Sequence, residues 1–286
     1  MEIYSLADIK KGLPSLVEFD EVNTLVTKTV LNSEYAEFIK AFFHYGSFSW
    51  KTHNIFSDLD YYVLWNEGNR DMFDSFLESM SKIPMNSSLK VMFRLKDTTD
   101  FLEDDELFRM FCIKELLKKD NFFFSGTGPQ SVFLESIPTI DFQLIHSRLI
   151  NDINEYIDYI ENINIENINE GQLRTICKFP LKVVRDYLIY MTHDRSFKYP
   201  ADTHDRLIDV YSKIAPNSAM HPLGVIFQIK EEYKTRILSC KNKECTDEKY
   251  REIFHGLTKI IEPLDTFLKE NLIMLKASLP VDQGPL

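Results

Sequence analysis

Two aspartates separated by one residue, Asp58 and Asp60, are the side chains of this sequence best suited to chemistry. They open a segment rich in Tyr, Val and Trp, which is typical of a β-strand. Because side chains alternate along a strand, the two carboxylates point to one face and lie ~6–7 Å apart. Oxygen-only ligands select hard cations over zinc. The pair therefore predicts a site for Mg²⁺ or Mn²⁺.

Gly46 and Ser47 precede this pair by the length of one loop. They follow the aromatic and aliphatic segment Glu37–Tyr45, which is typical of a strand, and ten residues separate Ser47 from Asp58. Gly46 has no side chain, so its backbone N–H groups can approach a phosphate, and Ser47 adds a hydroxyl. A phosphate cradle beside a metal pair is what transfer of a nucleotidyl or phosphoryl group requires.

An ordinary hairpin, with Asp58 as a turn residue, is the competing interpretation of this stretch. Gly, Ser and Asp all favour turns, and no catalytic role is needed to explain them there. The strand patterns on both sides of the loop favour the functional interpretation.

A third carboxylate would complete such a site, and Asp141 is the best candidate. It lies in Thr139–Ile145, where apolar and polar residues alternate, and this pattern predicts a strand with Asp141 on its polar face. A charge in these apolar surroundings is costly unless a cation offsets it. We therefore expect Asp141 to be a metal ligand, a general base that takes the acceptor's proton, or both.

Basic residues of the C-terminal half are candidate phosphate ligands. Lys178, Lys182 and Arg185 are spaced to lie on one face of a helix, from which they can reach a triphosphate. A solvated basic face explains the same spacing equally well.

The composition limits the class of protein. The chain has 286 residues and a net charge of −11, which argues against a general nucleic-acid binder because phosphate backbones favour basic surfaces. No apolar run approaches the ~20 residues of a membrane helix, so no membrane partner is expected. The N-terminus lacks the basic start and apolar block of a signal peptide, which predicts a cytoplasmic protein. The close pair Cys240 and Cys245 has no second pair beside it, so no zinc site is expected.

The elements that must position these residues form two halves. Residues 1–147 mix strand and helix patterns, whereas residues 148–275 carry helix patterns almost throughout. We expect an α+β fold, with a short mixed sheet covered by helices on one side, followed by a helical bundle that binds the acceptor. Ligands would lie in the cleft between the halves. Residues 276–286 are expected to form a flexible tail.

The individual elements follow from the same periodicities. Strands are expected at Glu37–Tyr45, Asp58–Trp65, Leu89–Leu95, Ser131–Glu135 and Thr139–Ile145. Helices are expected at Leu16–Leu31, Arg70–Lys82, Glu103–Leu117, Leu149–Ile163, Gln172–Thr192, Asp202–Ile214, Leu223–Ser239 and Asp247–Leu272.

The stretch His44–Trp65 resembles the signature of a known enzyme superfamily. Gly46-Ser47, the ten-residue gap and Ser57-Asp58-Leu59-Asp60 look like the polymerase-beta-like nucleotidyltransferases. Within that superfamily, Tyr45-Gly46-Ser47-Phe48 is most similar to small bacterial antibiotic nucleotidyltransferases of the lincosamide and aminoglycoside type. This chain departs from the family in the loop after Ser47, which has no further glycine.

The resemblance implies magnesium-dependent transfer of a nucleoside monophosphate, AMP from ATP, onto a hydroxyl of a lincosamide or aminoglycoside, and hence antibiotic resistance. It implies that Asp58 and Asp60 hold the metal. It also implies that Gly46 and Ser47 hold the β- and γ-phosphates of the nucleoside triphosphate. Lys198, which precedes a helix, resembles the lysine that contacts the phosphates in related enzymes.

Two other classes of function stay open. A nucleotidyltransferase that modifies a protein or tRNA, as toxin–antitoxin enzymes do, predicts an exposed acceptor groove and, for RNA, a basic stripe. A non-catalytic nucleotide-binding module would keep the fold without turnover. The intact Asp58 and Asp60 argue against such a module, whereas a missing third carboxylate would favour it.

Overall fold

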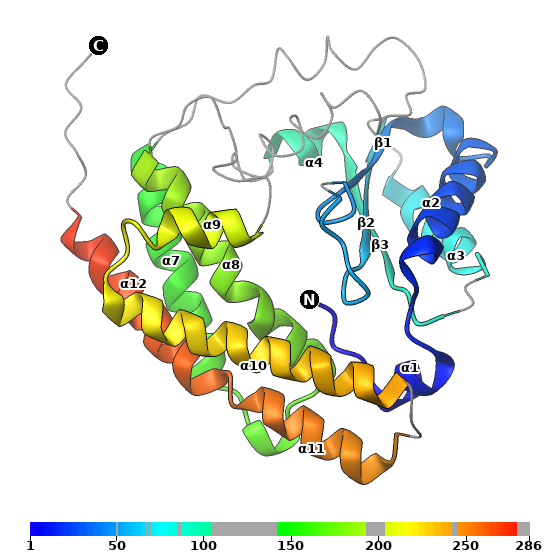
Figure 1. The fold of residues 1–286 in the computed structure, drawn as a ribbon. Helices are drawn as coiled ribbons and strands as arrows, with labels where there is room; N and C mark the ends of the chain where they lie inside the picture. The colour runs from blue at the N-terminus through cyan, green and yellow to red at the C-terminus, as the bar shows by residue number, and fades with distance from the viewer. Residues whose placement is uncertain are drawn as a thin grey trace. The chain divides into compact units, whose positions relative to one another are not determined.

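The structure is a computed structural model that describes residues 1–49, 51–66, 68, 70–84, 87–103, 142–192, 204–241 and 245–278. The chain divides into two compact units (Figure 1). Lys11–Ile140 is called the sheet unit, and Met1–Lys10 together with Asp141–Leu286 is called the helical unit. The domain boundary after residue 147 and the acceptor-binding role of the helical half stay predictions.

Three strands form the sheet of the first unit. They are β1 (Ile39–Tyr45), β2 (Leu59–Trp65) and β3 (Val91–Asp97), in the order β1-β2-β3. β1 is antiparallel to β2, and β2 is parallel to β3. A parallel pair needs a crossover, which here runs through the short helix η2 (Arg70–Met72) and α3 (Phe73–Ser81). The expected mixed sheet is confirmed.

Helix α2 (Leu16–Leu31) covers one face of this sheet together with α3. It begins with a capping box, in which the Ser15 hydroxyl accepts from the Glu18 N–H and the Glu18 carboxylate accepts from the Ser15 N–H. Its bounds are those that the sequence predicts. Its buried residues recur every three or four positions and pack into the core of the sheet unit: Phe19, Val22, Val26 and Val30.

The expectation that helices lie on one side of the sheet is wrong. Helix α4 (Thr98–Glu103) contacts the second face, where the Phe101 ring packs edge-on against Tyr62 at 6.1 Å. The physical reason is the burial of β2, which is at most 1% exposed from Tyr61 to Trp65. A strand that is apolar on both faces needs cover on both.

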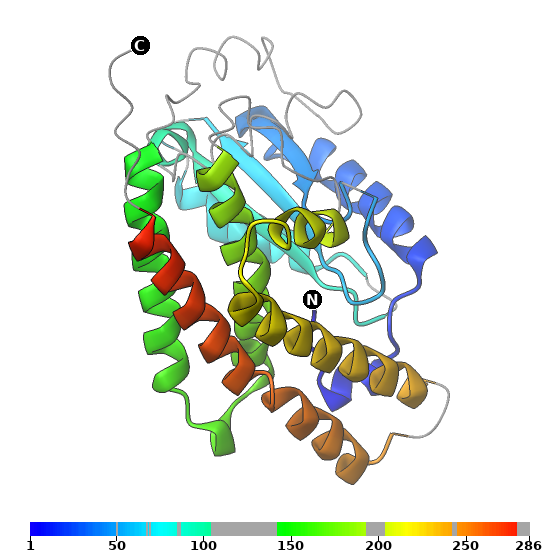
Figure 2. The same ribbon diagram turned by 60° about the vertical axis from the view of Figure 1, so that its left-hand side comes forward.

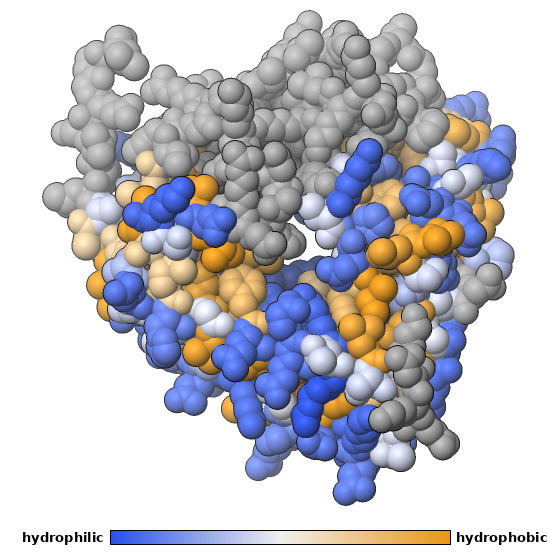
Figure 3. Space-filling model, in the orientation of Figure 1, coloured by the Kyte–Doolittle hydropathy of each residue, from blue (hydrophilic) through white to orange (hydrophobic). Residues whose placement is uncertain are grey.

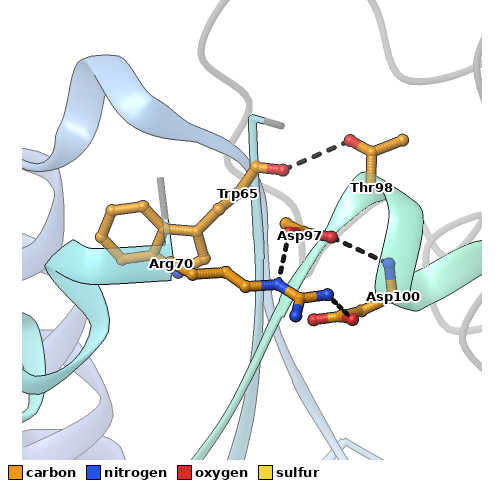
Figure 4. Close-up of polar contacts among 5 residues, drawn as sticks. All are labelled: Trp65, Arg70, Asp97, Thr98 and Asp100. Atoms are coloured by element: carbon orange, nitrogen blue, oxygen red, sulfur yellow. Dashed lines mark hydrogen bonds and ion pairs between the residues drawn. The ribbon is translucent and has the colours of Figure 1, made fainter. Parts of the chain in front are cut away.

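A polar cluster closes the sheet at the carboxyl ends of β2 and β3 (Figure 4). Arg70 Nε donates to Asp97 Oδ2 at 2.7 Å, and Arg70 also pairs with Asp100. The Asp100 N–H donates to Asp97 Oδ1 at 2.8 Å. The Thr98 hydroxyl donates to the Trp65 carbonyl at 3.3 Å. These bonds tie η2 and α4 to the sheet at the end opposite Asp60.

Long helices make up the helical unit, as Figure 2 shows. They are α7 (Phe142–Glu161), α8 (Glu170–Thr192), α10 (Asn217–Lys241) and α12 (Ile261–Ala277), joined by the shorter α1 (Leu6–Lys11), η3 (Ile165–Asn167), α9 (His204–Tyr211) and α11 (Asp247–Thr258). α12 packs against both α7 and α10. The expected helical bundle is confirmed.

The helices at the C-terminal end differ from the expectation. The single helix predicted over Asp247–Leu272 is two helices, because Pro263 in the first turn of α12 cannot continue a helix from before. The last of these helices extends to Ala277, so the first residues of the expected tail are helical. Residues 279–286 lie outside the described residues.

The strand expected at Thr139–Ile145 is wrong for its last four residues, because α7 begins at Phe142. Ile145 starts a buried series that continues with Leu149 and Ile153 at a spacing of four. This helical period overrides the alternation in the short preceding window. The strand expected at Ser131–Glu135 lies outside the described residues.

None of the described helices has the length and apolarity needed to cross a membrane. On the face shown in Figure 3, hydrophilic side chains lie among patches of hydrophobic residues. This pattern agrees with the high content of charged residues, which is 27% of the chain.

Candidate active site

The end of β1 and the start of β2 bring together the two parts of the sequence motif. Tyr45, the last residue of β1, pairs with Asp60 of β2. Gly46 therefore lies directly beside the aspartate, and a Cβ placed on it would be 3.3 Å from Asp60 Oδ2. Gly46 also has a φ of +75°. Only glycine combines this backbone conformation with so close an approach without strain.

Asp58 lies immediately before β2, at a point where the chain is already held against β3. The Leu59 N–H donates to the Lys90 carbonyl at 2.9 Å. If the extended backbone of β2 continues back to Asp58, this residue lies on the same face as Asp60, and both residues are partly buried. The carboxylate pair is thus carried by the sheet and not by the tip of the loop.

Aromatic contacts hold the first part of the loop that follows Ser47. Phe48 is buried and stacks on Phe19 of α2, with ring centroids 6.2 Å apart. The His53 ring lies 4.9 Å from both of these rings. Burial lowers the pKa of His53, although the charge of Asp20 acts in the opposite direction. The imidazole ring packs the loop onto α2, and its burial favours the neutral form.

A tight turn holds the second part of the loop. The Ser57 N–H donates to the Asn54 carbonyl at 2.8 Å, and the Asn54 N–H donates to the Ser57 hydroxyl at 3.0 Å. The Asn54 side chain also accepts from the Phe56 N–H at 2.9 Å. Ser57, which belongs to the family-like motif, thus fixes the direction in which the chain enters Asp58.

Two basic residues of β3, Arg94 and Lys96, were not among the candidates predicted from the sequence. The parallel register pairs Asp60 with Met92, Tyr62 with Arg94 and Leu64 with Lys96. Paired residues of neighbouring strands share a face, so Arg94 and Lys96 lie on the same face as Asp60. Arg94 and Lys96 are two positions apart in β3, and this spacing was the sequence signal that they share a face. Basic groups of this kind suit the recognition of phosphate.

Lys182 lies on α8, where it is engaged within the helical unit. Its Nζ is 3.0 Å from Asp152 Oδ2 of α7 and 5.2 Å from the centre of the Tyr156 ring. Burial alone would lower the pKa of Lys182, but hydrogen bonds to Tyr156 and Asp152 raise it to about 12. The lysine is therefore charged and already paired, and its role as a phosphate ligand stays a prediction.

The remaining candidate residues, Asp141 and Lys198, lie outside the described residues, so their roles also stay predictions. Among the residues that the structure describes, no group of three or more His, Cys, Asp or Glu side chains could hold a metal ion. Two carboxylates nevertheless fit magnesium, which binds through one or two carboxylates completed by substrate phosphates and water.

Comparisons with known proteins find similarity among solved structures. No protein-family model matches the sequence, and no curated protein sequence matches it. A solved structure similar to this chain is the crystal structure of spectinomycin adenyltransferase AAD(9) from Enterococcus faecialis with ATP and spectinomycin. The likeness covers 86% of this chain and 98% of that chain, at 15% sequence identity and a TM-score of 0.41.

Proposed function

We propose that this chain is a magnesium-dependent nucleotidyltransferase that moves AMP from ATP onto a hydroxyl of a small molecule, a lincosamide or aminoglycoside antibiotic. The observation that carries the proposal is the pairing of Tyr45 with Asp60, which sets Gly46 against the Asp60 carboxylate. This pairing joins in space the two parts of a motif that ten loop residues separate in the sequence. Antibiotic resistance would follow from such an activity.

Asp58 and Asp60 would hold the magnesium ion, because their oxygen-only donors fit a hard divalent cation. When bound, such an ion neutralises negative charge on the triphosphate. The glycine between the strands leaves space for a phosphate oxygen beside Asp60, where any side chain would intrude.

Backbone and side-chain donors would bind the phosphates. The N–H groups of Gly46 and Ser47, with the Ser47 hydroxyl, would bind the β- and γ-phosphates. Arg94 and Lys96 add positive charge on the Asp60 face. Lys182 and Lys198 are further proposed phosphate ligands.

Asp141 is proposed to take the proton of the acceptor hydroxyl, to bind the metal ion, or both. The acceptor oxygen then forms a bond to the α-phosphorus of ATP. The bond from that phosphorus to the bridging oxygen breaks, and pyrophosphate leaves. The chain's task is to hold both reactants in line, since positioning and charge stabilisation dominate such transfers.

The test is direct detection of the product. The protein is incubated with ATP, Mg²⁺ and a panel of lincosamides, aminoglycosides and spectinomycin, and each antibiotic is examined by mass spectrometry for the added mass of AMP. We expect one class of acceptor to gain a single AMP with release of one pyrophosphate. A folded, ATP-binding protein that modifies no member of the panel would contradict the acceptor class.

Asp60→Asn is the matched control for this experiment. It keeps the size of the side chain and removes the charge that would hold the metal. We expect a loss of at least about 3 kcal/mol of transition-state stabilisation, a factor of more than a hundred in rate, without unfolding. Near-normal turnover by a folded Asp60→Asn protein would refute the assigned metal site.

A further inference from the structure

Two thiols meet at the junction between α10 and α11. Cys240 is the penultimate residue of α10, and Cys245 precedes Thr246, whose side chain caps the N-terminus of α11. Their sulfur atoms are 2.9 Å apart. A disulfide bond has a sulfur–sulfur distance of ~2.05 Å, so only a small displacement separates the pair from bonding distance.

The two cysteines share a protected site. Cys240 is 3% exposed and Cys245 is 7% exposed. Burial and the neighbouring Cys240 raise the pKa of the Cys245 thiol to about 11, although Lys249 and Lys10 act in the opposite direction. Because the thiolate is the reactive form, the raised pKa slows the reaction of the Cys245 thiol at neutral pH.

The surroundings of the two sulfurs can be compared with those of a structural zinc site. Structural zinc needs four ligands, commonly cysteine and histidine. Within the described ranges no third His, Cys, Asp or Glu side chain joins the two sulfurs in a metal-binding group. A dithiol whose sulfurs already touch is instead suited to reversible oxidation.

We propose that Cys240 and Cys245 are a redox modification site that forms a reversible intramolecular disulfide with a small-molecule disulfide as oxidant. The site goes beyond the proposed transfer reaction and uses none of its residues. The bond would link the end of α10 to the start of α11, two helices of the helical unit that are labelled in Figure 1.

The reaction proceeds by two exchanges. One cysteine thiolate attacks a sulfur of the small disulfide, which forms a mixed disulfide and releases one small thiol. The second cysteine thiolate then attacks the protein sulfur of the mixed disulfide and expels the other small thiol. Two electrons pass from the protein to the oxidant, and the two protons of the cysteines end on the released thiols.

The new bond would add to ionic contacts around the ends of these helices. Arg236 of α10 and Glu252 of α11 pair at 2.6 Å, and Lys10 of α1 lies 3.6 Å from Asp247 of α11. A disulfide at this corner restricts the separation of the two helices. We therefore expect the oxidised protein to unfold at a higher temperature than the reduced protein.

The experiment equilibrates the full-length protein in buffers with increasing ratios of oxidised to reduced glutathione, followed by alkylation, digestion and mass spectrometry. We expect peptides joined through Cys240 and Cys245 that are two hydrogens lighter than the dithiol form and carry no alkyl group. Dithiothreitol should restore both alkylation sites. Formation should accelerate about tenfold per pH unit below the thiol pKa, because the thiolate fraction does.

Two cysteine variants test which thiols form the bond. Cys240→Ser should stop at the first exchange and retain one glutathione on Cys245. Cys177→Ser, which removes another buried cysteine, should leave the disulfide unchanged. Folded wild-type protein that forms no such bond in excess oxidised glutathione, or that joins either cysteine to Cys112 or Cys177, would overturn the proposal. The wild-type peptide map decides the question even if Cys240→Ser does not fold.

Discussion

At the scale of single residues, Gly46 combines a positive φ with a close approach to a side chain, as no other glycine of the described residues does. Its φ of +75° strains any other residue, and an added Cβ would press on Asp60 Oδ2 at 3.3 Å. We expect Gly46→Ala to reduce the free energy of unfolding by at least about 1 kcal/mol and to impair nucleotide transfer severely. Urea unfolding and the rate of transfer measure the two effects separately.

Gly68→Ala is the matched control for this change. Gly68 has a φ of +85°, but an added Cβ would meet no atom within 4 Å. Gly68→Ala should lower the free energy of unfolding about as much as Gly46→Ala does, and it should keep the wild-type rate of nucleotide transfer. Equal activity of the two variants would show that the contact between Gly46 and Asp60 has no bearing on transfer.

His53 gives the same loop a dependence on pH. Its pKa lies below the ordinary value of 6.5 in the folded protein because burial disfavours the charged form. The unfolded chain therefore binds the proton better, so stability is full above about pH 6.5 and falls as the pH drops below it. His53→Phe, which keeps the ring stacking, should flatten the change in melting temperature between pH 7.5 and pH 5.

The control for this prediction is His221→Phe, at an exposed position of α10. It should leave the acid sensitivity of the sheet unit as in the wild type. An unchanged pH dependence in His53→Phe would show that other groups cause the loss of stability in acid.

At the scale of elements, the cluster in Figure 4 fixes the crossover between the two parallel strands. Arg70→Met would leave the buried Asp97 carboxylate without its guanidinium partner. We expect a loss of about 1–3 kcal/mol in the free energy of unfolding, the range for a hydrogen bond to a charged group. Lys82→Met, which breaks an exposed pair with Glu78, should cost less than about 1 kcal/mol. Equal losses in urea unfolding would contradict the role of the cluster.

At the scale of the whole molecule, the first ten residues belong to the helical unit although the chain then enters the sheet unit. The Glu2 carboxylate is buried and lies 2.6 Å from Arg174 Nε of α8. The Tyr4 N–H donates to the Tyr233 hydroxyl at 3.0 Å. The helical unit is therefore completed by a segment more than 100 residues away in the sequence.

Breaking the ion pair between Glu2 and Arg174 should destabilise the helical unit. Arg174→Met leaves a buried carboxylate uncompensated, and we expect a loss of about 3 kcal/mol, measured by urea unfolding. The double variant Glu2→Met, Arg174→Met should recover part of the loss, because no buried charge remains. A double variant as unstable as the sum of both single variants would contradict the pairing.

The sequence by itself determined the local elements and the motif that they flank. The periodicities identified α2 and the three described strands, because a local apolar pattern reports directly on the face that an element buries. The spacing of Gly46 and Ser47 from the aspartates was likewise readable from a short stretch of chain. The strand predicted around Asp141 was wrong from Phe142 onward, because the few alternating residues there come just before a longer helical period.

Only the tertiary structure decided which of these residues meet. The register of β1 on β2 sets Gly46 against Asp60, and the parallel register of β3 adds Arg94 to the same face. The tertiary structure also brings the sulfur of Cys245 to that of Cys240. The register of paired strands depends on the burial of apolar surface between segments that are distant in the sequence. It therefore cannot be predicted from a local sequence pattern.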